Sequence, residues 1–98
     1  MWYLYILKSI KDSKLYIGST SDVNHRLGQH NKGLVTSTKH RRPWVLIYFE
    51  AYLTEHPARL RESKLKQFGA AYQELKKRVP EMQGCLVMED SEIPSILQ

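Results

Sequence analysis

Two short segments near the start of the chain show the apolar and aromatic pattern of β-strands. Residues 2–9 (WYLYILKS) and residues 15–20 (LYIGST) each place aromatic or aliphatic side chains at close, partly alternating intervals. A polar stretch, residues 10–14, separates the two segments and is typical of a turn. The pattern therefore predicts two strands that pair as a hairpin.

The next elements are predicted to be a helix, a loop and a third strand. Ser21 or Asp22 can cap a helix over residues 23–31. Residues 32–43 are polar and basic, which favours a loop. Residues 44–53 (WVLIYFEAYL) are the most strand-like segment of the chain, so we expect the central strand of the sheet there.

Two further helices are predicted after the third strand. Thr54 can cap the first, which we expect to end at Gly69. Its apolar positions are Ala58, Leu60, Leu65 and Phe68. The second fits residues 70–79 and is stopped by Pro80. The order β-β-α-β-α-α predicts an α+β fold, with a small, mainly antiparallel three-stranded sheet flanked by helices.

Length and composition narrow the class of protein. The chain has 98 residues and 42% hydrophobic content, which fits one small domain with a thin core. Its single cysteine, Cys85, excludes an internal disulfide and a cysteine-based zinc cluster. No apolar run approaches the ~18 residues of a membrane span, and the N-terminal residues lack the pattern of a signal peptide. We therefore expect a cytoplasmic location and no membrane partner.

The charge is distributed unevenly and predicts a division of the chain. Residues 80–98 hold four of the ten acids and no Lys or Arg. Residues 1–79 therefore carry all 15 basic residues against six acids, a balance of +9. We expect a basic body over residues 1–79 and an acidic tail over residues 80–98. A polyanion is a natural partner for the basic body, although a basic charge can also serve solubility alone.

Tyrosines on the predicted hairpin are the first candidates for chemistry. Tyr5 and Tyr16 lie on its two strands and can approach each other. Half-buried strand tyrosines are commonly core residues, which is the alternative here. Gly18 interrupts the second strand and indicates a bulge or a close approach of another backbone or a ligand.

Charged residues on the predicted helices add further candidates. Arg26 and His30 are four residues apart and share one helix face. Arg26 can hold a phosphate bidentately or pair with Asp22, and His30 can hydrogen-bond a phosphate or move a proton. Glu62 lies on an apolar stripe and needs a partner, either a basic side chain or a magnesium ion.

Basic residues of the loop and of the first long helix are candidates for contacts with a nucleic-acid backbone. They are Lys32, Lys39, His40, Arg41, Arg42, Arg59, Arg61 and Lys66. Such residues are often merely solvated, but together they can form one positively charged face.

The candidate residues stand in an order that resembles the GIY-YIG nuclease superfamily, and most closely its small stand-alone bacterial members. The two motifs that name the family appear as Tyr3-Leu4-Tyr5 and as an intact Tyr16-Ile17-Gly18. Arg26 and His30 follow, and residues 61–68 (RESKLKQF) supply a helical glutamate. The resemblance covers roughly residues 1–79.

The resemblance implies a role for each matched residue. Tyr5 and Tyr16 match the motif tyrosines, one of which is a candidate general base or water-orienting group. Arg26 matches the arginine that steadies the scissile phosphate, and Glu62 matches the single metal-binding glutamate. His30 matches an auxiliary helix position. Gly18 matches the motif glycine, which the backbone requires.

These roles predict a magnesium-dependent (or manganese-dependent) DNA endonuclease that acts in repair or recombination. We expect selectivity for DNA structure, or no preference, over selectivity for base sequence. Branched, nicked, single-stranded and duplex DNA all remain open as substrates, as does RNA. The alternative is a nucleic-acid-binding module with little catalysis of its own that acts with a protein partner.

Overall fold

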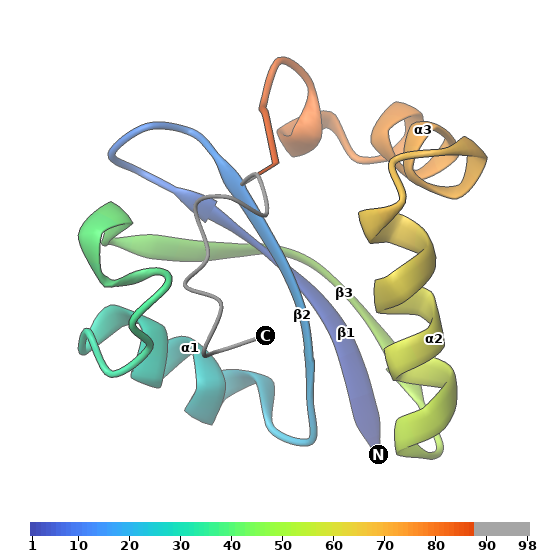
Figure 1. Cartoon of the computed structure of the whole chain (residues 1–98), viewed down its shortest axis with the longest axis horizontal. Coiled ribbons are helices and arrows are strands. Elements are labelled where there is room, and N and C mark those ends of the chain that lie inside the picture. The colour runs from blue at the N-terminus through green and yellow to red at the C-terminus, as the bar shows by residue number, and fades with distance from the viewer. Residues whose placement is uncertain (88–98) are drawn as a thin grey trace.

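The computed structural model describes residues 1–87 and has the predicted order of elements (Figure 1). The strands are β1 (Trp2–Ser9), β2 (Leu15–Thr20) and β3 (Trp44–Tyr52). The helices are α1 (Val23–Asn31), α2 (Glu55–Lys66) and α3 (Ala70–Arg78), with short 3₁₀ turns η1 (Lys39–Arg41) and η2 (Pro80–Met82). Both strand pairs are antiparallel. The α+β prediction with a three-stranded antiparallel sheet is confirmed.

The central strand is β1, because the strands lie in the order β2-β1-β3. The expectation that residues 44–53 form the central strand is therefore wrong. Four consecutive residues of β1, from Leu4 to Leu7, are buried, whereas β3 leaves several side chains exposed. The aromatic and β-branched residues of β3 favour a strand but do not decide its place in the sheet. A central strand covered on both faces needs an unbroken run of apolar residues, and β1 has that run.

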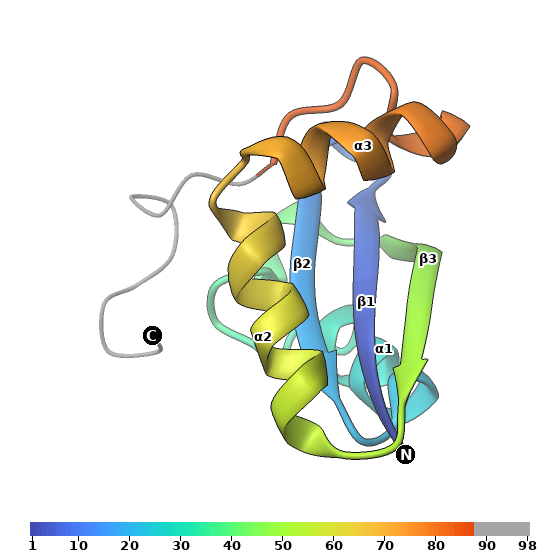
Figure 2. The ribbon, with the colours of Figure 1, turned by 90° about the vertical axis from the view of Figure 1, so that its right-hand side faces the viewer.

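Helices cover both faces of the sheet. Figures 1 and 2 show α1 on one face and α2 and α3 on the other. The core under α2 and α3 includes Leu4, Ile6, Ile17 and Leu65, while a smaller cluster under α1 is built on Tyr5, Leu7 and Trp44. Because strand side chains alternate, neighbouring residues of β1 supply the two cores in turn.

A register shift in β3 changes which of its side chains face α1. Ile6 pairs with Tyr48, but Leu7 pairs with Leu46, so Ile47 is an extra residue, as in a β-bulge. Beyond the bulge, Phe49 lies opposite Tyr5. Strict alternation from Leu46 would have placed Tyr48 on the α1 face instead.

The ends of the helices follow the predictions in part. Asp22 caps α1, and its carboxylate accepts a hydrogen bond from the backbone N–H of His25. Thr54 stands at the N-cap of α2 without a side-chain capping bond. The helix ends at Lys66, and the left-handed residue after it is Phe68, with φ 57°, in place of the expected Gly69.

The segment after α3 packs onto the domain as far as it is described. Met82 and Cys85 are buried in the core under α2 and α3. The N–H of Leu15 donates to the carbonyl of Leu86, and Val87 forms a parallel bridge with Leu15. The rest of the predicted acidic tail lies outside the described residues, and the boundary at residue 79 stays a prediction. Among residues 1–87, no helix has the length and hydropathy to cross a membrane.

Candidate active site

Tyr5 and Tyr16 lie together on the α1 face of the sheet, with ring centroids 6.3 Å apart. Tyr5 is opposite Gly18 in the β1–β2 register. A Cβ atom at Gly18 would lie 2.7 Å from the Tyr5 hydroxyl and 3.1 Å from the Tyr16 ring, so only glycine leaves room for these rings. The close neighbours of this glycine are side chains, where the sequence predicted a bulge, another backbone or a ligand. Tyr5 is 2% exposed and Tyr16 is half-buried, so Tyr16 is the more accessible of the two tyrosines.

A buried chain of hydrogen bonds connects Tyr5 with the loop after α1. The Tyr5 hydroxyl lies 3.1 Å from Nε2 of His30, and Nδ1 of His30 lies 2.7 Å from Oγ1 of Thr38. The Thr38 hydroxyl donates to the carbonyl of Val35, so it accepts from His30 Nδ1–H. His30 Nε2 is then the acceptor for the Tyr5 hydroxyl.

The protonation states of this chain follow from its burial. Burial, with a smaller effect from the nearby Arg26, lowers the pKa of His30 to about 4, so the imidazole is neutral at neutral pH. Burial also raises the pKa of Tyr5. Tyr16 and Glu62 raise that pKa further, whereas Arg26 opposes the rise. Tyr5 therefore keeps its proton in the free protein and donates it to His30.

Arg26 brings a positive charge from α1 to the two tyrosines. Its guanidinium is near enough to Tyr5 to act on the pKa of that phenol through a hydrogen bond and through its charge. Arg26 also donates to the side-chain oxygen of Gln29 at 2.9 Å. Because Gln29 is neutral, this bond orients the guanidinium without cancelling its charge. Asp22, considered as its partner from the sequence, instead caps the helix.

Glu62 approaches from α2 on the other side of the sheet, near the edge strand β2. Its Oε1 accepts a hydrogen bond from Ser19 at 2.6 Å, and its Oε2 accepts one from Lys66 at 2.7 Å. The glutamate side chain is 21% exposed. The partners that the sequence argument required for this carboxylate are thus a serine and a lysine.

The chemistry around Glu62 fits a magnesium ion. Among residues 1–87, no three His, Cys, Asp or Glu side chains converge, so a cage made of protein ligands is excluded there. A single carboxylate suits magnesium, which keeps most of its water and takes further oxygens from substrate phosphate. Glu62 is partly exposed, and Lys66 is a flexible partner that can move aside. Glu62 is therefore the residue that would hold the metal.

The predicted basic residues fall into two groups instead of one face. The first group lies at the C-terminal end of α1 and in η1, and comprises Lys32, Lys39, His40, Arg41 and Arg42. It adjoins a pocket of about 450 Å³ lined by Lys11, Asn31, Lys39, His40, Arg42 and Pro43. Of this group, Arg41 forms an ion pair with Asp12.

The second group lies on α2, across the sheet from α1, and each member pairs with an acid of α2 or of strand β3. Arg59 pairs with Glu55 and lies over the ring of Trp2, and Lys66 pairs with Glu62. Arg61 makes two hydrogen bonds to Glu50, at 2.9 and 3.0 Å. The expected single basic face is not formed, because helix α2 covers the opposite face of the sheet from η1.

Two residues of the site were not predicted from the sequence. Thr38 fixes the tautomer of His30, and Ser19 holds Glu62. Thr38 lies in a polar loop and Ser19 beside the glycine of a strand, where hydroxyl residues are common. The only sequence cue for Ser19 is that it follows the Tyr16-Ile17-Gly18 motif directly.

The fold and the site define a class of protein. The family model described as the GIY-YIG catalytic domain matches residues 1–76, so this chain belongs to the GIY-YIG family. Similar chains are small bacterial proteins of the group named UPF0213. One, from Staphylococcus haemolyticus, is 43% identical over 67 residues, which are 67% of this chain and 80% of the relative.

Two further matches carry the same group name. A UPF0213 protein of Pediococcus pentosaceus is 42% identical over 67 residues, covering 67% of this chain and 70% of the relative. The solution NMR structure of a UPF0213 protein from Bacillus halodurans matches with a TM-score of 0.48 and 28% identity, over 85% of this chain and 89% of that chain.

Proposed function

We propose that the protein is a magnesium-dependent endonuclease that hydrolyses phosphodiester bonds in DNA. The observation that carries this proposal is the convergence on Tyr5. Tyr16, Arg26 and Glu62 come from a strand and two helices, and all three lie close enough to Tyr5 to act on the pKa of its phenol. Arg26 thus places a cation beside the Tyr5 phenol on the α1 face, and Glu62, held by Ser19 on the α2 side of the sheet, supplies a carboxylate for a metal. Membership of the GIY-YIG family supports the same chemistry.

Hydrolysis adds the oxygen of water to phosphorus and releases one ester oxygen as an alcohol. Tyr16 is the residue we assign to orient this water through a hydrogen bond to its phenol oxygen, because it is the more accessible tyrosine. The proton that the water loses ends on the released alcohol. Tyr5 donates to His30 and stays protonated, so it holds the geometry of the pair. His30 packs edge-to-face on Tyr16, with centroids 4.9 Å apart, and so positions that ring as well.

Arg26 is assigned to a non-bridging oxygen of the scissile phosphate, because a guanidinium matches that geometry with two donors. Glu62 would hold the magnesium ion, which, when bound, supplies charge stabilisation for the phosphate and for the leaving oxygen. Ser19 keeps one carboxylate oxygen of Glu62 in place. The basic pocket beside Lys39 and Arg42 is the surface we assign to the flanking backbone phosphates.

The test is cleavage of labelled DNA: supercoiled plasmid, duplex, single strand, flap and four-way junction, with Mg²⁺ or with EDTA. Wild type is compared with Glu62→Gln and with Glu55→Gln, which removes an exposed acid of the same helix. We expect Mg²⁺-dependent products that Glu62→Gln lacks and Glu55→Gln retains. Tyr16→Phe should lose more activity than Tyr5→Phe.

Two results would contradict the proposal. Cleavage by Glu62→Gln at the wild-type rate would remove the metal role from that residue. Salt-sensitive DNA binding without product on any substrate would instead favour the alternative of a binding module that acts with a partner. Repair or recombination in the cytoplasm is the setting we propose for the activity, by analogy with the family.

A further inference from the structure

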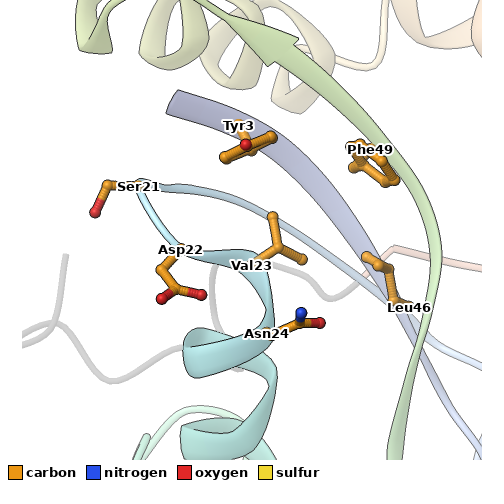
Figure 3. A pocket seen from close by; sticks show the side chains of 7 residues that line it. All are labelled: Tyr3, Ser21, Asp22, Val23, Asn24, Leu46 and Phe49. Carbon is orange, nitrogen blue, oxygen red and sulfur yellow. The ribbon is translucent and has the colours of Figure 1, made fainter. Parts of the chain in front are cut away.

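A pocket of about 410 Å³ lies beside the candidate active site on the same face of the sheet. Figure 3 shows its walls, which come from the start of α1 on one side and from β1 and β3 on the other. The lining residues are Tyr3, Ser21, Asp22, Val23, Asn24, Leu46 and Phe49. The volume is in the range of pockets that bind small planar ligands.

Phe49 is the most unusual residue of this pocket. Its side chain is 53% exposed, although it lies within strand β3 and is paired with the buried Tyr5 of the central strand. It pairs with Tyr5 across β1 and β3, so it lies directly next to the candidate active site. It also meets Tyr3 edge-to-face, with ring centroids 6.0 Å apart. An exposed aromatic ring beside a polar site is a typical platform for a flat ligand.

The bulge in β3 is what places Phe49 there. Continued alternation from Leu46 would turn Tyr48 and Glu50 toward α1 and Phe49 away from it. With the bulge, Glu50 lies on the α2 side, bound to Arg61. The strand thus presents the Phe49 ring to the pocket and turns the Glu50 carboxylate away from it. Bulges commonly re-aim side chains next to active sites in this way.

The residues that line the pocket indicate which kind of ligand it can bind. Val23, Leu46 and Phe49 supply apolar walls, and the Asn24 amide can both donate and accept hydrogen bonds. No Lys or Arg lines the pocket, so it suits a neutral planar group better than a phosphate. Arg26, one turn further along α1 than Asp22, lies outside it.

We propose that this pocket binds an unpaired nucleobase of the substrate strand, stacked on Phe49. The inference rests on the proposed nuclease function and narrows its substrate. Tyr3 precedes Tyr5 by two residues on one face of β1, a separation of about 7 Å. A base in the pocket therefore belongs to a nucleotide at or next to the reacting phosphate. A base stacked within an intact duplex cannot reach such a pocket, so the substrate is single-stranded or locally unpaired.

Equilibrium binding in EDTA tests the proposal without relying on cleavage. Fluorescein-labelled single-stranded DNA, RNA of the same sequence and the matching DNA duplex are titrated by anisotropy. The proteins are wild type, Phe49→Ala, Phe49→Tyr and Leu53→Ala, which truncates a more exposed apolar residue outside the pocket. We expect Phe49→Ala to weaken single-strand binding by roughly 5- to 100-fold and to leave duplex binding unchanged. Phe49→Tyr and Leu53→Ala should bind like wild type.

A second readout reports stacking directly. A single-stranded oligonucleotide carrying 2-aminopurine should lose fluorescence on binding wild type and recover it with folded Phe49→Ala, checked by circular dichroism. If Phe49→Ala weakens binding of single-stranded DNA, the base belongs to DNA, and if it weakens binding of the RNA strand, the base belongs to RNA. Unchanged single-strand affinity in Phe49→Ala, or an equal loss on duplex, would overturn the proposal. Loss of single-strand affinity in a protein that cuts no substrate would leave the base pocket standing and the nuclease function refuted.

Discussion

His30 makes the stability of the protein depend on pH in a range where few other groups titrate. The imidazole is buried between Tyr5 and Thr38, and its pKa is about 4, against about 6.5 in an unfolded chain. Between these two values the unfolded chain binds a proton that the folded protein excludes. The contribution of the neutral His30 to the free energy of unfolding is therefore fully present above about pH 6.5. It is lost as the pH falls from there through 4.

The size of the effect follows from the two pKa values. A difference of about 2.5 units corresponds to about 3 kcal/mol once both states are protonated. The linkage between proton binding and unfolding gives a loss of about 2 kcal/mol in the free energy of unfolding between pH 7 and pH 5. The pKa values of Asp12 and Glu50 are lowered by their hydrogen-bond partners. Their contributions to the free energy of unfolding are therefore lost only when the pH falls below the pKa values of free carboxyl groups. For a domain whose stability is on the order of 5–15 kcal/mol, this loss is large.

The assay is urea unfolding at pH 7, 6 and 5, followed by circular dichroism, for wild type, His30→Gln and His56→Gln. His56 is an exposed histidine on α2 and serves as the control. Wild type and His56→Gln should lose about 2 kcal/mol between pH 7 and 5, and His30→Gln should lose little. An equal loss in His30→Gln and wild type, or an NMR titration of the His30 imidazole near 6.5, would refute the reasoning.

Three further outcomes are expected. Gly18→Ala should destabilise the protein by about 1–3 kcal/mol in thermal unfolding, because the new methyl meets the Tyr5 hydroxyl at 2.7 Å; an unchanged melting temperature would contradict this close approach. Lys39→Gln should weaken DNA binding and reduce the slope of log K against log salt by about one, measured by anisotropy, whereas Lys77→Gln on α3 should not. Tyr16→Phe should lower the rate of Mg²⁺-dependent DNA cleavage more than Tyr5→Phe does, and the reverse order would exchange their assigned roles.

Much of the fold could be predicted because local signals and tertiary structure agree. The apolar spacing and the Asp22 cap place α1 at residues 23–31, where the structure has it. The strand pattern and the polar turn likewise predict the β1–β2 hairpin. Of the residues selected through the family resemblance, Tyr5 and Tyr16 lie with ring centroids 6.3 Å apart and Arg26 lies near Tyr5, while Glu62 lies on the α2 side of the sheet. Their catalytic roles stay predictions.

The remaining features depend on contacts between distant segments. Propensity favours β3 as the central strand, yet β1 holds that place because both other strands pair with it. No local pattern pairs Arg61 with Glu50, eleven residues earlier, because the pairing depends on the bulge. Thr38 and His30 are eight residues apart and meet only because the loop folds back under Trp44, whose indole N–H donates to the Thr38 carbonyl.

The hydrogen-bond partners of the carboxylates near the sheet favour Glu62, on the α2 side, as the acid that would share a cation with substrate. Asp12 is bound to Arg41, and Asp22 accepts from the first turn of α1. Glu50 is turned to the opposite face by the bulge and held there by Arg61. Glu62 has one oxygen fixed by Ser19 and the other on the flexible Lys66. We therefore propose that a cation bridges Glu62 and the incoming phosphate.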